Sequence, residues 1–77
     1  MVARRIEIIQ SWFGPGVQLT TRDIYDLFLE NYPRTCPTMY ELGNILGRQK
    51  MFKKVGLVFI DTSRRNLKYA LWEMDFD

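Results

Sequence analysis

Three polar side chains able to recognise a planar ligand recur at helical spacing in the middle of the chain. Tyr40, Asn44 and Arg48 follow one another at four-residue intervals, so in a helix they share one face, and Gly47 lies on the same face. Asn can form paired hydrogen bonds with adenine, and Arg can do the same with guanine. Gly47 costs a helix about 1 kcal/mol relative to alanine. Close approach of the backbone to a ligand would explain why a glycine is present there. Packing against another helix, or random sequence change at a solvated position, would explain it as well.

Positive charge is gathered in one part of the chain. Residues 34–68 carry a net charge of +6, whereas the stretches before and after them carry −1 and −3. Two cationic clusters stand out in this stretch, namely Lys50, Lys53 and Lys54, and then Arg64, Arg65 and Lys68. We expect the two clusters to converge beside the polar helix face and to contact phosphates, which requires only charge in the right region. Ordinary solvated charges are the alternative.

Catalytic chemistry has few candidates. The sequence of 77 residues has no histidine, which removes the usual general base. Cys36 is the single cysteine, so an internal disulfide and an ordinary zinc site are both excluded. Asp23, Asp26 and Glu30 have the spacing of a solvated helix face rather than of paired catalytic carboxylates. We therefore expect no enzymatic activity, no cofactor and no metal.

The elements that must position these residues follow from apolar periodicity. Three helices are predicted, over residues 3–13, 21–32 and 39–50. The second and third begin with the same device, because Thr20 and Thr38 each stand three residues before a carboxylate, Asp23 or Glu41, with which they can form a capping box. Short length and globular composition indicate one α+β domain over residues 1–77.

Strands are predicted over residues 17–19, 55–60 and 67–74, with a turn at 62–66. In the last strand Leu67, Tyr69 and Leu71 alternate with Lys68, Ala70 and Trp72, and we expect the first set to face the core. The final hairpin holds more apolar side chains than a small core can accept, namely Val58, Ile60, Trp72, Met74 and Phe76. An apolar patch on its outer face would favour a protein partner or a homodimer.

The order helix, short strand, helix, helix, strand, turn, strand resembles the winged helix-turn-helix fold. The resemblance covers nearly the whole chain and is carried by the segments Leu19–Ile24 and Glu41–Gly47 and by the hairpin with Arg64 and Arg65 at its tip. More narrowly, the third helix and hairpin resemble the winged-helix tails of phage and plasmid primase-helicases, including the virulence-associated-E type.

The resemblance implies a DNA-binding module of transcription or replication. In that family the third helix lies in the major groove, which places Tyr40, Asn44, Gly47 and Arg48 at the bases, while the hairpin, as the wing, contacts the phosphate backbone. Two alternatives remain open: a protein-protein adaptor, and an appended domain of a larger replication enzyme that binds single-stranded or forked DNA. No segment has the features of a signal peptide or a membrane span, so a cytoplasmic location is expected.

Overall fold

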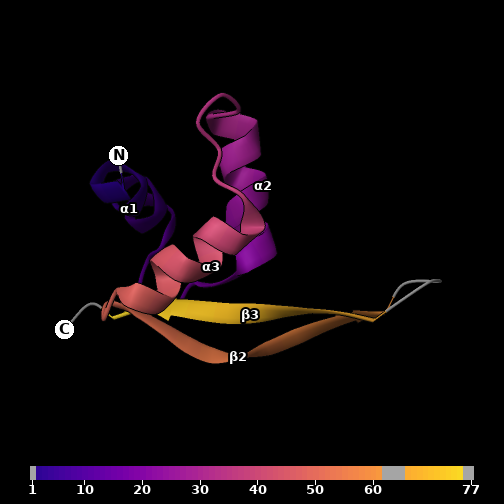
Figure 1. The fold of residues 1–77 in the computed structure, drawn as a ribbon. Coiled ribbons are helices and arrows are strands. Elements are labelled where there is room, and N and C mark those ends of the chain that lie inside the picture. The colour runs from indigo at the N-terminus through magenta and orange to yellow at the C-terminus, as the bar shows by residue number, and fades with distance from the viewer. Residues whose placement is uncertain (1, 62–65, 76–77) are drawn as a thin grey trace.

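A computed structural model describes residues 2–61 and 66–75 of the chain. Three helices and three strands form the fold (Figure 1), and they are α1 (Val2–Trp12), β1 (Gln18–Thr20), α2 (Thr21–Asn31), α3 (Met39–Arg48), β2 (Phe52–Asp61) and β3 (Asn66–Met74). The predicted element order is confirmed. The helices α2 and α3 begin where predicted, and the other helix limits differ by one or two residues. By contrast, β2 begins three residues earlier than predicted, so that Lys53 and Lys54 belong to a strand.

Capping boxes fix where α2 and α3 begin. The hydroxyl of Thr20 accepts a hydrogen bond from the backbone N–H of Asp23, and the Asp23 carboxylate accepts one from the Thr20 N–H, both at 3.0 Å. Thr38 and Glu41 repeat the arrangement at 3.1 and 3.0 Å. Each box satisfies two amides that a helix start would otherwise leave free, and both predictions are confirmed.

The turn between α1 and β1 depends on a glycine. The backbone N–H of Val17 donates to the Gly14 carbonyl at 3.0 Å, with Pro15 and Gly16 between them. Gly16 has a φ of 79°, a conformation that side chains with a Cβ rarely adopt. Proline followed by a glycine in the left-handed conformation is typical of a type II turn. This turn leads the chain from α1 into β1.

The strands form an antiparallel sheet in the order β1-β3-β2, and the three helices lie on one of its faces (Figure 1). Trp72 of β3 pairs with Leu19 of β1 and with Lys54 of β2. The β2–β3 register shifts between Lys54 and Gly56, which is a β-bulge at Val55. The bulge matters because one extra residue exchanges the faces on which the following side chains lie.

Trp72 anchors the helix-covered face of the sheet. Its side chain is 6% exposed, and its indole N–H donates to the hydroxyl of Thr21 at 2.9 Å. Ala70 and Met74, which share this face, pack against the same core. The expectation that Leu67, Tyr69 and Leu71 face the core is therefore wrong. Both alternating sets of β3 contain apolar residues, and the large indole fills the core while Leu71 and Tyr69 remain half-buried on the other face.

The core is one hydrophobic cluster between the helices and the sheet. Its buried members are Ile9, Phe13, Ile24, Phe28, Leu42, Ile45, Leu46, Phe52 and Trp72. Aromatic contacts join distant elements, since the ring of Trp12 meets Phe28 edge-on at 4.9 Å between centroids and Phe13 lies 5.4 Å from Phe52. Within the described ranges, no helix has both the length and the apolar character that a membrane span requires.

Candidate nucleic-acid interface

α3 presents a polar face that no other described element covers. Leu42, Ile45 and Leu46 are buried on its inner side, and the fully buried Leu42 and Leu46 fix the helix orientation. On the opposite side the structure places Tyr40, with 79% of its surface exposed, and the exposed residues Asn44, Gly47 and Arg48. The four residues that the sequence grouped by spacing are thus brought to one exposed surface.

Packing within the chain does not explain the glycines of α3. A Cβ added at Gly43 or at Gly47 would meet no heavy atom within 4 Å. Packing against another helix of this chain, one of the interpretations open from the sequence, is therefore excluded for the described residues. The open space around both glycines is compatible with close approach to a ligand and with random sequence change at a solvated position.

A small cavity separates the polar face of α3 from α1. Its volume is about 180 Å³, and it is lined by Arg5, Glu41, Asn44, Ile45 and Arg48. Nη1 of Arg5 lies 3.6 Å from a carboxylate oxygen of Glu41. Both side chains are partly exposed, so the pair contributes little to stability. It does direct one arginine of α1 toward the face of α3 that carries Asn44 and Arg48.

The carboxylate of Glu41 stays ionised because the helix start holds it. The Thr38 backbone N–H donates to it and lowers the pKa of Glu41 below its ordinary value, and the charge of Arg5 lowers it further. Glu41 is therefore an anion beside the candidate interface, and it offsets part of the positive charge of Arg5.

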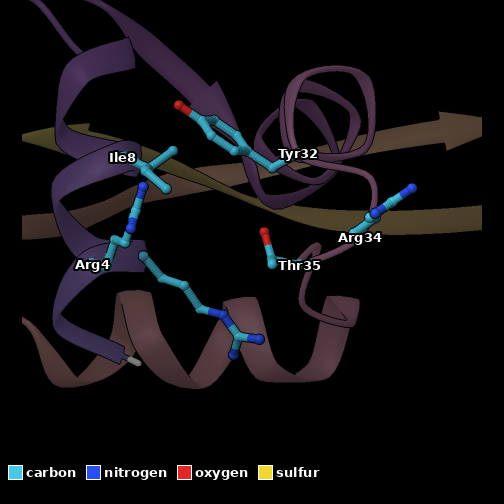
Figure 2. A pocket seen from close by; sticks show the side chains of 6 residues that line it. Arg4, Ile8, Tyr32, Arg34 and Thr35 are labelled. Carbon is cyan, nitrogen blue, oxygen red and sulfur yellow. The ribbon is translucent and has the colours of Figure 1, made fainter.

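A larger cavity lies between α1 and the connector that joins α2 to α3 (Figure 2). Its volume is about 530 Å³, and its lining consists of Arg4, Arg5, Ile8, Tyr32, Arg34 and Thr35. Arg5 lines both cavities. The two adjoining cavities therefore extend from the α2–α3 connector to the exposed face of α3. Four arginines line them, hereafter the arginine cluster: Arg4, Arg5, Arg34 and Arg48.

Cys36 lies in the same connector and is half-buried. Burial raises the pKa of its thiol, and the nearby charge of Arg5 opposes the shift. The thiol is therefore mostly protonated near neutral pH. Among the described residues, no group of three or more Cys, Asp or Glu side chains is placed to hold a metal ion.

The described members of the two predicted cationic clusters do not all lie on one face of the sheet. Lys53 pairs with Glu73 across the strands on the face of the sheet away from the helices, and its Nζ lies 3.2 Å from a carboxylate oxygen of Asp75. Lys54 pairs with Trp72 and so belongs to the helix-covered face, where it is exposed. Lys68 pairs with Phe59 on that same face but four residues along β3, about 13 Å away at the rise of a strand.

The expectation of convergence is therefore wrong for Lys53, because strand alternation directs its side chain to the other face. For Arg64 and Arg65 it stays a prediction. Lys50, just beyond α3, is exposed. Arg64 and Arg65 lie outside the described residues.

Sequence reasoning missed three members of the arginine cluster. Arg4 and Arg5 belong to a stretch whose net charge is −1, so counting charge by segment concealed them. Arg34 was counted within the basic stretch but was not assigned to a site. Adjacent arginines in the first turn of α1 were the available signal, because the helix dipole disfavours cations there and no acidic residue in that turn compensates them.

Comparison with known proteins gives a structural neighbour but no match in sequence. No protein-family model matches the chain, and no curated protein matches it in sequence. The crystal structure of a "putative nucleic acid binding protein" from an uncultured marine organism superposes with a TM-score of 0.78, at 23% sequence identity, over 95% of this chain and 79% of that one. At this identity the similarity establishes a shared fold.

Proposed function

We propose that this protein is a winged-helix module that binds double-stranded DNA and has no catalytic activity of its own. The observation that carries the proposal is the uncovered polar face of α3, with Tyr40, Asn44, Gly47 and Arg48 exposed above a buried apolar side and the arginine cluster beside it. The fold shared with the "putative nucleic acid binding protein" supports the same class of function.

The dimensions of α3 suit a duplex. Its 10 residues extend about 15 Å, and the major groove, about 12 Å wide, admits one helix. In this arrangement Asn44 and Arg48 reach base edges, and Gly47 lets the helix backbone approach a phosphate or a base.

Phosphate contacts come from the cations around α3 rather than from one merged lysine cluster. Arg5 lies beside the polar face, Lys50 follows α3 directly and is exposed, and Lys54 lies on the helix-covered side of the sheet. In the proposal the β2–β3 pair is the wing, so that Lys68, Arg64 and Arg65 contact the backbone farther along the duplex. The module would serve transcription or replication.

Fluorescence anisotropy with short duplexes, matched forked DNA and the matched single strand tests the proposal. We expect the duplex to bind most tightly. Arg48→Ala should weaken duplex binding about tenfold, as expected for loss of a charge-assisted contact. Lys53→Ala is the matched control, because it removes the same charge from the opposite face of the sheet and should leave affinity within about twofold.

Equal loss in Arg48→Ala and Lys53→Ala would contradict the proposed face, because it would reduce binding to general charge attraction. Tighter binding of the fork or the single strand would favour the alternative of an appended domain that acts on replication intermediates.

A second candidate function is protein binding or dimerisation through the β2–β3 pair. Phe59 is 66% exposed, and Leu57 and Ile60 are exposed as well. The strand register places Phe59 and Leu57 on the helix-covered face, so the expectation of the patch on the outer face is wrong for these two and holds for Ile60. The sequence predicted that the hairpin has more apolar side chains than the core can accept. Of these, Trp72 is buried and Met74 packs against the core, whereas Phe76 lies outside the described residues. Light scattering over a concentration series tests dimerisation. A monomer mass that does not change with concentration would exclude a homodimer.

A further inference from the structure

The cavity between α1 and the α2–α3 connector has the size and lining of a ligand site, apart from the face of α3. Its volume of about 530 Å³ falls inside the range of roughly 300–1,000 Å³ that small-molecule sites occupy. The lining combines three arginines with one tyrosine, one threonine and one isoleucine. Such a set suits an anion joined to a flat apolar group.

Two of the three lining arginines have no ion-pair partner in the described part of the chain. No carboxylate belongs to the lining, and among the described residues neither Arg4 nor Arg34 has an ion-pair partner. Arg5 is paired with Glu41, at 3.6 Å, on the side of the smaller cavity. Arg4 and Arg5 also stand in the first turn of α1, where the helix dipole adds to their positive potential. An anion in the cavity would relieve this unfavourable arrangement, and guanidinium groups bind phosphate oxygens in a paired geometry.

The apolar side of the cavity is held in place by the fold. Tyr32 is 40% exposed, and its ring lies 6.2 Å from that of the fully buried Phe28, so the core holds Tyr32 while leaving part of it accessible. The backbone N–H of Tyr32 donates to the Phe28 carbonyl, and that of Thr35 donates to the Tyr32 carbonyl at 3.1 Å. The Tyr32 ring lies near Ile8, and the hydroxyl of Thr35 points into the space between α1 and the connector (Figure 2).

We propose that this cavity binds one nucleotide unit, with the phosphate held by Arg4 and Arg5 and the base against Tyr32 and Ile8. Stacking on an aromatic ring is tolerant of base identity, because every base has a π face. Arg34 stands at the rim with its guanidinium extending outward (Figure 2), and it serves as a second phosphate contact after a change of rotamer. The nucleotide unit comes either from a free mononucleotide or from an unpaired strand.

NMR titration of the ¹⁵N-labelled full chain tests the proposal with three probes: dAMP, a single-stranded deoxyadenosine tetranucleotide and inorganic phosphate. We expect saturable shifts at the amides of Arg4, Arg5, Ile8 and Thr35 with at least one nucleotide probe, and weaker binding of inorganic phosphate. Saturation by dAMP assigns the source to free nucleotides, whereas saturation by the tetranucleotide alone assigns it to an unpaired strand, and either result supports the proposal.

Two variants and a control separate the site from general charge attraction. Arg4→Gln should weaken the nucleotide probes about tenfold, and Tyr32→Leu should weaken them while leaving inorganic phosphate unchanged. Lys53→Gln removes one charge from the far face of the sheet and should change nothing. Arg4 is exposed, so its variant should keep the wild-type spectrum apart from local shifts.

Absence of saturable shifts, an equal effect of Arg4→Gln and Lys53→Gln, or inorganic phosphate binding as tightly as the nucleotides would overturn the proposal. The probes contain no duplex. Failure of this site therefore leaves the α3 proposal standing, and failure of duplex binding leaves this one standing.

Discussion

The bond between Trp72 and Thr21 links β3 to the first turn of α2, so its loss should lower the stability of the whole fold. Thr21→Val keeps the shape of the side chain but removes the oxygen that accepts the indole N–H at 2.9 Å. Both residues are buried, Thr21 at 8% and Trp72 at 6% exposure, so water cannot replace the lost partner. Leaving a buried donor unsatisfied costs about 2 kcal/mol, which lowers the melting temperature by roughly 10 °C in a domain of this size.

Urea unfolding followed by far-UV circular dichroism measures this cost. The midpoint should fall while the dependence on urea stays unchanged. Thr35→Val is the matched control, because Thr35 is exposed and its hydroxyl makes no hydrogen bond among the described residues; its effect should stay within about 0.5 kcal/mol.

A double-mutant cycle isolates the contact itself. Trp72→Phe removes the donor, so combining it with Thr21→Val should cost less than the sum of the two single changes, by about 1 kcal/mol. Strict additivity, or a Thr21→Val protein as stable as Thr35→Val, would refute the placement of Trp72 on the helix-covered face of the sheet.

Four further predictions follow from local structure. Thr38→Ala removes the cap of α3 and should cost about 1 kcal/mol in urea unfolding. Gly16→Ala places a Cβ on a residue with φ 79° and should cost about 1–2 kcal/mol in the same assay. The pKa of Glu41 is lower in the folded chain than its ordinary value of 4.5. The stability advantage of the wild type over Glu41→Gln should therefore be complete above about pH 4.5 and disappear as the pH falls through the folded-state pKa. A stability advantage that grows in acid would contradict the assignment. Because burial raises the pKa of Cys36, iodoacetamide at pH 8 should alkylate the folded chain more slowly than the urea-unfolded chain.

The helices were predictable because their signals are local. Thr20 and Thr38 each stand three residues before a carboxylate, and the structure closes both capping boxes. Gly16, next to Pro15, likewise marks a turn by backbone chemistry that needs no knowledge of the rest of the fold. Features of this kind depend on residues within a few positions of one another.

The faces of the sheet were not predictable in the same way. Leu71 and Trp72 are adjacent and apolar, so alternation alone does not say which of them is inside. The bulge at Val55 then moves Leu57 and Phe59 to the helix-covered face and leaves Val58 on the other. Its position is visible only from the pairing of two strands, which is information that a single segment lacks.

The candidate interface was half predictable. The helical period placed Asn44 and Arg48 on one face, and the structure leaves that face exposed. Arg5 approaches it from the opposite end of the sequence through the packing of α1 beside α3. Lys53, which charge counting had included, is directed to the far face by strand alternation. Tertiary packing therefore decides which cations surround α3.

The dependence of duplex affinity on salt for the wild type, Lys54→Ala and Lys53→Ala tests the central claim most directly. The proposal predicts that log affinity falls linearly with log salt, that Lys54→Ala, on the helix-covered face, reduces the slope by about one, and that Lys53→Ala, on the opposite face, leaves it unchanged. Affinity that ignores salt, or equal slopes for the two variants, would contradict it.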